Sequence, residues 1–391
     1  MQAQKLPEDS CNDRTQKPSS PENAEEPSRP KRSDYIGRLE SAIQDYLREA
    51  QVPEFQRLCE LRKKGWENPA GDAFFAKQRQ TADNADDKTA RHFYTMMLDI
   101  GKDMNRQTGV FSIEPSSPTQ QPAILDMCMA PGGFLATALA LNPTAQALAF
   151  SLPPEEGGHN VALDLAAYPN VTAHLCDITM LAADIGVSSA EIPVDHPDVH
   201  GFLPAHFNQK KFDLAFCDGQ VLRTHARASY REKREATRLT LTQLILSLSH
   251  LKPGGTMIVL SHKIEAPAMV QMLYEFSRFS TVTVYKHAKF HAKRSSFYMI
   301  ASGLKVDSEE AVALLERWRR KWKSLVLDMK LTDERFAEMA EEGAPTIEEI
   351  LDTFGERLIE MGRTVWGVQA EALGKAPFIK SKAEKSGSWR S

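Results

Sequence analysis

The fold is decided by one stretch of the sequence, Ile124-Leu125-Asp126-Met127-Cys128-Met129-Ala130-Pro131-Gly132-Gly133-Phe134. The stretch contains a short apolar run, a carboxylate, a tight Gly-Gly turn and the start of an apolar helix. In an open α/β sheet, ligands bind at the carboxyl ends of the strands, and glycines let the backbone approach a ligand closely. We therefore expect a strand–turn–helix unit whose turn binds a ligand, with Asp126 placed to receive a cationic group.

Short apolar runs alternate with helical stretches beyond this unit. Seven runs are predicted strands: 123–125, 147–152, 171–175, 212–216, 257–260, 281–285 and 297–301. Helices are predicted between them over 134–141, 161–167 and 229–251. This alternation indicates a layered α/β sheet. No helix separates the last two strands, so a hairpin is expected at one end of the sheet.

Both ends of the chain carry additions to this domain. We expect a disordered tail over 1–33, a helical segment over 34–115, the α/β domain over 116–305, a helical extension over 306–375 and a disordered tail over 376–391. Thr346 and Glu349 form a capping-box pattern at a helix start. The terminal helices carry apolar stripes, so they are expected to pack on the domain or to bind a protein partner, with Trp318 and Trp322 as packing residues.

Composition excludes several classes of protein. The five cysteines are odd in number and form no C-x-x-C pair, which argues against a disulfide framework and a structural zinc site, and no other metal site is predicted. No apolar run reaches the roughly 18 residues of a membrane span, and the first residues lack a secretory apolar core. An intracellular protein, cytoplasmic or nuclear, is expected. The net charge of −4 shows no global basic field.

Further carboxylates follow other predicted strands. Asp177 follows the third strand and Asp218 follows the fourth, while Leu251-Lys-Pro-Gly-Gly255 precedes the fifth. Each aspartate by itself could be a turn or cap residue. Three aspartates after three strands, joined to Ala-Pro-Gly-Gly, favour a shared binding site.

The stretch at 124–134 resembles motif I of the FtsJ-type RNA methyltransferase family, whose members methylate ribose 2′-hydroxyls. The resemblance covers about residues 120 to 305. It implies a Rossmann-like methyltransferase domain with a seven-stranded mixed sheet, an antiparallel last strand, and S-adenosylmethionine (SAM) as cofactor. The residues that it assigns to the cofactor are Asp126, Cys128, Ala130, Pro131, Gly132, Gly133, Phe134, Ser151, Asp177 and Asp218. At Ser151 the family often has an acid that contacts the cofactor ribose.

The catalytic pattern departs from that of the family. Ribose methylation in the family uses a Lys-Asp-Lys-Glu tetrad, in which a lysine oriented by carboxylates takes the hydroxyl proton. Asp218 matches the aspartate, but Thr95, Leu260 and Ser296 stand at the other three positions. Lys263 follows Leu260 closely. Either Asp218 and Lys263 form the catalytic pair, or the tetrad is lost and Lys263 is a solvated surface residue.

Two basic runs lie where a substrate would bind. They contribute Arg223, Arg227 and Arg231 in one run and Lys289, Lys293 and Arg294 in the other, and could hold the phosphates of RNA. Glu232 and Glu235 interleave with the first run, which would also fit an ordinary charged helix face.

Together these features predict a SAM-dependent methyltransferase that acts on RNA at a ribose hydroxyl. Two alternatives remain: a non-catalytic SAM- or RNA-binding module of the same fold, and a small-molecule methyltransferase. The second alternative predicts a closed, mostly apolar pocket over Asp218, covered by the N-terminal helices. An RNA enzyme predicts an open basic groove.

Overall fold

A single mixed sheet organises the molecule. The computed structural model describes residues 32–83, 87–114 and 120–379. The strand order is β3-β2-β1-β4-β5-β7-β6, and β7 alone among these strands runs antiparallel to its neighbours β5 and β6. The bounds are β1 Ala123–Asp126, β2 Gln146–Ser151, β3 Val171–Leu175, β4 Phe212–Cys217, β5 Leu251–His262, β6 Thr281–Tyr285 and β7 Ser296–Ser302. The predicted fold class, including the terminal hairpin, is confirmed.

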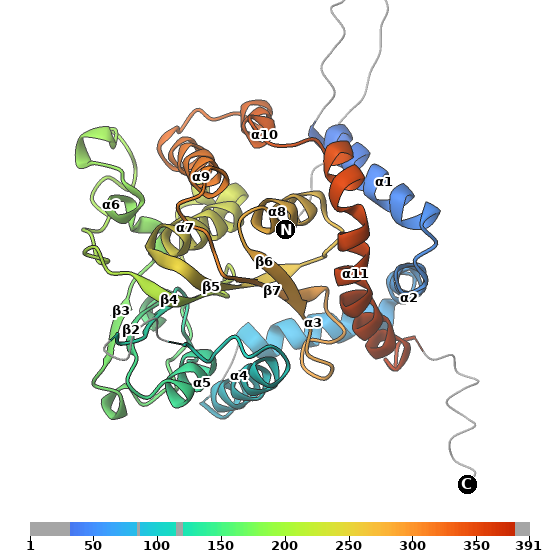
Figure 1. Ribbon diagram of the computed structural model, residues 1–391, viewed down its shortest axis with the longest axis horizontal. Coiled ribbons are helices and arrows are strands. Elements are labelled where there is room, and N and C mark those ends of the chain that lie inside the picture. Colours follow the sequence, from blue (N-terminus) through green and yellow to red (C-terminus); the bar gives the residue numbers. More distant parts are fainter. Residues whose placement is uncertain (1–31, 84–86, 115–119, 380–391) are drawn as a thin grey trace, which may run out of the picture.

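The central strands are buried on both faces. Ile124 and Leu214 belong to one apolar core, and the next residues along their strands, Leu125 and Ala215, belong to the other. Side chains alternate across a strand, so a strand between two helical layers is apolar throughout. Figure 1 shows α4 (Asp87–Thr108) and α5 (Gly133–Leu141) on one side of the sheet, and α7 (Glu235–His250) and α8 (Pro267–Ser277) on the other.

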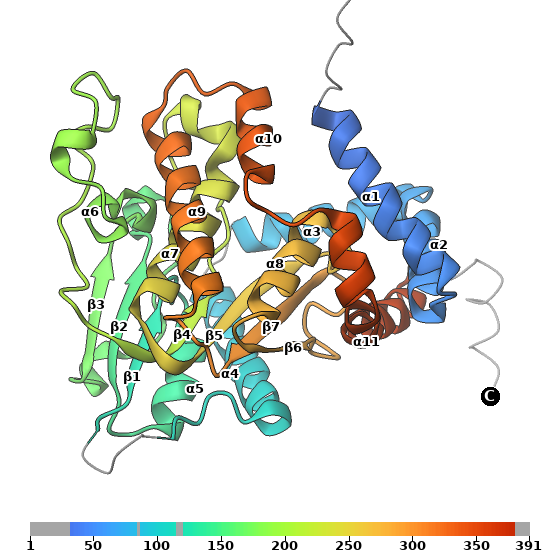
Figure 2. The ribbon, with the colours of Figure 1, turned by 45° about the horizontal axis from the view of Figure 1, so that its top comes forward.

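The N- and C-terminal extensions pack against each other. Helix α11 (Ile347–Gly374) contacts α1 (Arg32–Glu49) and α2 (Pro53–Trp66) and crosses the edge strand β6 (Figure 2), where Arg357 donates to the carbonyl of Val282. An exposed sheet edge is a template for aggregation, and this helix covers it. The remaining helices are α3 (Pro69–Asp83), α6 (Ala182–Ile185), α9 (Glu309–Leu327) and α10 (Asp333–Glu341).

A buried polar cluster joins both extensions to the sheet. Glu265, in the loop after β5, accepts hydrogen bonds from Arg62 of α2 (2.5 Å) and from the indole of Trp366 in α11 (2.9 Å). Helix α9 packs on α7 and buries Trp318 and Trp322 in the same hydrophobic core as Trp366. The Trp322 indole donates to Thr242 of α7 (2.8 Å), which confirms the packing role of both tryptophans.

Several predicted element bounds were wrong. Only the 3₁₀ turn Leu165–Ala167 forms within the helix expected over 161–167, because the Asp164 side chain caps Ala166 there. Strand β5 begins at Leu251, since Gly254 and Gly255 pair with Leu304 beyond β7. Helix α8 was not predicted.

Both predicted tails overlap the described residues, since α1 begins at Arg32, within the tail expected over 1–33. Ala376 and Phe378 are buried, and Asn68 donates to the carbonyl of Phe378 (2.6 Å), so the C-terminal tail was predicted to begin too early. The rest of the two predicted tails, apart from the start of α1, lies outside the described residues. None of the helices in the described ranges is long and apolar enough to cross a bilayer.

Candidate active site

A cavity of about 530 Å³ opens where four parallel strands end. Cys128 follows β1, Ser151 ends β2, Asp177 follows β3 and Asp218 follows β4, and all four line the cavity. The carboxyl ends of neighbouring parallel strands meet at one edge of a sheet, so residues far apart in sequence converge there.

The Gly-Gly turn lies beneath this cavity and packs tightly against the neighbouring elements. Gly132 has φ +106°, and a Cβ there would lie 2.8 Å from Cβ of Leu163. A Cβ on Gly133 would lie 2.7 Å from the Tyr94 carbonyl of α4. Ala130 and Pro131 line the cavity, whereas Gly132, Gly133 and Phe134 are buried beneath it. The turn therefore requires glycine for close packing against α4 as well as for its backbone conformation.

Two carboxyl groups without a basic partner lie under the cavity. Asp126 is buried, and one of its carboxylate oxygens accepts from the Cys128 backbone N–H (3.2 Å). Burial and the charge of Asp218 raise the pKa of Asp126 well above its usual range. Burial also raises the pKa of Asp218 to about 7. A cation in the cavity would stabilise the charged forms of both groups.

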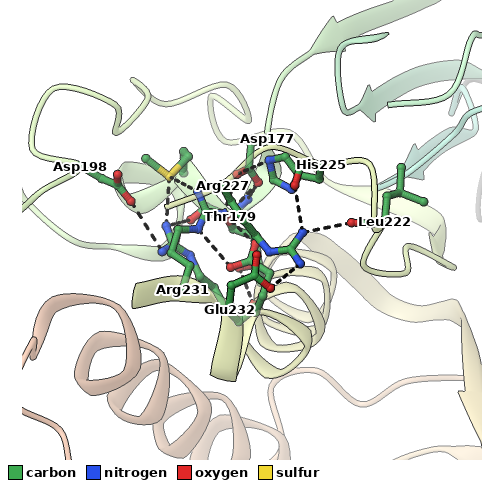
Figure 3. A network of polar contacts seen from close by, with 12 residues as sticks. Asp177, Thr179, Asp198, Leu222, His225, Arg227, Arg231 and Glu232 are labelled. Carbon is green, nitrogen blue, oxygen red and sulfur yellow. Dashed lines mark hydrogen bonds and ion pairs between the residues drawn. The ribbon is translucent and has the colours of Figure 1, made fainter. Parts of the chain in front are cut away.

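Asp177 differs because an arginine neutralises it. Arg231 donates to Asp177 (2.7 Å), to Thr179 (2.8 Å) and to Glu235 (2.6 Å), as Figure 3 shows for the labelled residues. Burial opposes ionisation of Asp177, but Arg231 and Thr179 lower its pKa overall. Asp177, His225 and Glu235 have ligand atoms within 4.8 Å of one another, as a metal site would need. Arg231 already supplies the positive charge between the two carboxylates.

Two loops form the roof of the cavity. The hydroxyl of Thr224 donates to the carbonyl of Gly157 (2.6 Å), which links the loop after β4 to the loop after β2. Arg227 holds the first loop by donating to the carbonyls of Leu222 (3.0 Å) and His225 (3.2 Å). Sequence reasoning missed the loop residues that line the cavity, namely His159, Asn160, Gln220, Thr224 and His225. No local pattern marks them, because the contact between the loops places them.

One face of helix α4 forms an apolar wall. Ala90, Phe93, Met96, Met97 and Ile100 line the cavity at helical spacing. Thr95 points away from it: its side chain is exposed and donates to the Arg91 carbonyl (3.0 Å). Tyr298 of β7 pairs in register with Leu260 of β5, and both also line the cavity.

The expected pair of Asp218 and Lys263 does not form. Lys263 does not line the cavity, and its Nζ atom lies 3.2 Å from Oε1 of Glu40 on α1. The loop after β5 turns toward the extensions because Glu265 is held there by Arg62 and Trp366. Ser296 is buried beside the cavity and Leu260 forms part of its wall.

The predicted substrate residues divide into two groups. Arg227 and Arg231 face inward, in ion pairs with Glu232 (2.9 Å) and Asp177, so their predicted contacts to a substrate are not available in this structure. Arg223, Lys289 and Arg294 are exposed, and Lys293 is partly exposed over the ring of Phe74.

The cavity fits SAM in size and in donor chemistry. Its volume lies within the roughly 300–1,000 Å³ of small-molecule sites. Carboxyl groups without a basic partner at β1 and β4 suit a cationic ligand. Cys128, Ala130, Pro131, Ser151 and Asp218 are placed to contact the ligand.

Comparisons with known proteins agree with this geometry. The FtsJ-like methyltransferase family model matches residues 102–304. No curated protein sequence matches the chain significantly.

Solved structures show only remote similarity. An rRNA methylase from Streptococcus thermophilus is 15% identical over 47% of this chain and 88% of its own, with a TM-score of 0.30. An O-methyltransferase family protein from Burkholderia thailandensis is 11% identical over 63% and 71%, with a TM-score of 0.31. The N-methyltransferase NodS from Bradyrhizobium japonicum, in complex with S-adenosyl-L-homocysteine (SAH), is 12% identical over 56% and 89%, with a TM-score of 0.30.

At these TM-scores no functional argument rests on the individual structures. The family match, in contrast, spans more than half of the 391 residues. The chain therefore belongs to the FtsJ-like methyltransferase family, whose cofactor is S-adenosylmethionine.

Proposed function

We propose that the protein methylates a ribose 2′-hydroxyl of RNA. The observation that carries this proposal is Asp218, a carboxyl group that faces the cofactor cavity with no basic side chain bound to it. The exposed basic residues Arg223, Lys289 and Arg294 add the positive charge that a phosphate backbone requires.

Asp218 has the properties of a proton acceptor for this reaction. A general base works best when its pKa lies near the working pH, and the pKa of Asp218 is raised to about 7. SAM supplies an electrophilic methyl group when bound. As the ribose oxygen bonds to the methyl carbon, its proton would pass to the Asp218 carboxylate, and the carbon–sulfur bond would break to leave neutral SAH.

Tyr298 is a positioning residue for the same oxygen. Burial and the charge of Asp218 raise the pKa of its phenol well above the usual range, so it stays a neutral hydrogen-bond donor. It pairs in register with Leu260, where family members have a lysine. The chain thus keeps the family's aspartate and offers a phenol beside the position of one family lysine.

The test is methyl transfer from radiolabelled SAM to total cellular RNA. We expect label in RNA, at linkages that resist alkaline cleavage because the 2′-oxygen is blocked. Asp218→Asn should lower transfer by about 10²-fold or more, the scale of general-base catalysis. Asp307→Asn, a change of an exposed carboxylate on the surface, is the matched control. SAM binding without transfer to any RNA or extract would instead support a non-catalytic module.

The apolar wall of α4 favours a second candidate function. Five residues of this N-terminal helix cover the cavity, as a small-molecule methyltransferase would require. Transfer of label to a small compound in an extract, with none to RNA, would select this alternative.

A further inference from the structure

A second cavity of about 160 Å³ adjoins the cofactor cavity on the acceptor side. The two cavities share the wall residues Ile100, Gln220, Leu260, His291, Arg294 and Tyr298. The rest of the side cavity is formed mainly by the loop between β6 and β7 and by the ends of these strands. A molecule held near Asp218 could therefore extend into it.

The side cavity is lined by basic side chains. Its lining includes the guanidinium of Arg294 and the amine of Lys286, whose pKa burial lowers to about 7. The imidazoles of His262, His287 and His291 also line it, and burial lowers their pKa values, so they serve as neutral hydrogen-bonding groups. Among the described residues that line it, none is acidic. Binding sites with this composition favour anions.

The guanidinium of Arg294 lines this cavity, and two further guanidinium groups from separate segments lie close enough to act on it electrostatically. Burial lowers the pKa of Arg294, and so do the positive charges of Arg79 on α3 and of Arg223 in the loop after β4. The Arg294 guanidinium donates to a neutral partner on α3, the side-chain oxygen of Gln78 (3.4 Å). Like charges brought together destabilise each other, and an anion bound between them would offset that cost.

The arrangement is held by contacts that do not depend on a ligand. The ammonium of Lys286 is buried and donates to the carbonyls of Arg294 (2.8 Å) and Ser296 (2.6 Å). Lys293 lies 6.0 Å from the ring centre of Phe74 on α3. These contacts fix the β6–β7 loop against α3, so Arg294 is preorganised and little of its binding free energy would be lost in ordering it.

We propose that this side cavity binds a phosphate group of the methyl acceptor through Arg294, and that helix α3 contributes Arg79 to the same site. That the phosphate belongs to RNA rests on the proposed function. In RNA the 3′-phosphate of a nucleotide is the direct neighbour of its 2′-hydroxyl. A hydroxyl at Asp218 would bring that phosphate to the side cavity. The N-terminal extension is then part of the acceptor site, although α3 precedes the residues matched by the family model.

The test uses two probes on the full chain saturated with SAH. The first probe is a short fluorescent single-stranded RNA, titrated from about 50 to about 200 mM salt. The second is inorganic phosphate, followed by the shift in Tm against chloride at equal ionic strength. Variants are Arg294→Gln and Arg79→Gln, with Arg335→Gln on α10, an exposed arginine, as matched control. SAM affinity of each variant, measured by calorimetry, shows that the cofactor site is intact.

We expect each of the first two variants to reduce the slope of log affinity against log salt by about 0.7, the value for one phosphate contact on a single strand. Phosphate should raise the Tm of the wild type and of Arg335→Gln but not of Arg294→Gln. RNA binding with unchanged slopes in both variants would overturn the inference and leave the proposed function standing. Phosphate stabilisation without RNA binding would keep the anion site and reject RNA, which identifies a small phosphorylated acceptor. If phosphate stabilises no protein or all of them equally, the anion site is rejected.

Discussion

Two basic segments of similar composition differ in whether their basic side chains are buried and paired or exposed. The inner segment, residues 223–234, turns Arg227 and Arg231 into the protein, where their side chains are only 8% and 7% exposed. The outer segment, residues 286–294, keeps Lys289 and Arg294 at the surface, and Arg294 lines the side cavity. The difference comes from available carboxylates. Glu232, Glu235 and Asp177 pair with the inner arginines, whereas the outer segment contains no acidic residue.

This contrast shows that the number of positive charges in a segment does not measure its capacity to bind an anion. Charges that are paired and buried stabilise a particular loop conformation, and charges without a carboxylate partner remain available to a ligand. In this protein Arg227 and Arg231 of the inner segment shape the cofactor cavity, whereas the outer segment, together with the exposed Arg223, is suited to an acceptor. The following changes test that division, from the largest expected effect to the smallest.

Removing the central inner arginine should have the largest effect. Arg231→Met leaves Asp177 and Glu235 as close, buried and unpaired carboxylates. Breaking a buried pair in this way costs about 3–5 kcal/mol in free energy of unfolding. Urea unfolding measures the loss. Lys289→Met in the outer segment is the matched control, and an equal loss in both variants would contradict the division.

Removing the contacts that hold the loop after β4 should have an intermediate effect on stability and on SAM affinity. Arg227→Ala removes hydrogen bonds to the carbonyls of Leu222 and His225 and the ion pair with Glu232. Each such loss costs about 1–3 kcal/mol where a buried acceptor stays unpaired. SAM affinity should fall by roughly tenfold in calorimetry, with faster amide exchange in the loop after β4. Unchanged affinity would mean that this loop does not shape the cofactor cavity.

The two aspartates that line the cavity show the same contrast between a paired and an unpaired charged group. Asp177, paired with Arg231, stays ionised, whereas the pKa of Asp218 is raised to about 7. A raised carboxyl pKa means that the protein holds a proton below pH 7, and the sulfonium of SAM binds better once that proton is lost. SAM affinity should therefore rise about tenfold from pH 6 to pH 8. Neutral SAH should show a smaller rise, and Asp218→Asn should remove the difference between the two ligands.

The sequence predicted the cofactor half of the site better than the acceptor half. Among the residues assigned to the cofactor, six line the cavity, namely Cys128, Ala130, Pro131, Ser151, Asp177 and Asp218, whereas Asp126, Gly132, Gly133 and Phe134 do not. The residues at the cavity lie at or just after strand ends, which local patterns set. The acceptor half depends on contacts between distant segments. Lys263 was expected at Asp218, but Glu265, two residues later, is held by Arg62 from α2 and Trp366 from α11. No local pattern contains those partners.

Dependence on distant partners also explains why the pairing of the inner arginines was predicted only in part. Glu232 and Glu235 lie within the segment and did signal a self-paired helix face, as one interpretation of the sequence held. Asp177 lies more than fifty residues away and was assigned to the cofactor, so its pairing with Arg231 could not be foreseen. The N-terminal helical segment that contains α4, in contrast, was predicted, and the small-molecule alternative placed the N-terminal helices over Asp218, where α4 forms the apolar wall.

The smallest expected effect concerns Lys289, whose ammonium lies 4.9 Å from the ring centre of Phe290 at the surface. An exposed cation–π contact contributes about 0.5–1 kcal/mol at most, so Lys289→Gln should change the free energy of unfolding by less than that. Because its charge is available to a ligand, RNA affinity at low salt should still fall several-fold, and the loss should vanish at high salt as screening increases. Lys233→Gln is the matched control, since Lys233 is an inner-segment lysine paired with Asp333. Equal losses of RNA affinity in the two variants would show that RNA responds to overall charge, and the distinction between inner and outer segments would then have no bearing on the acceptor.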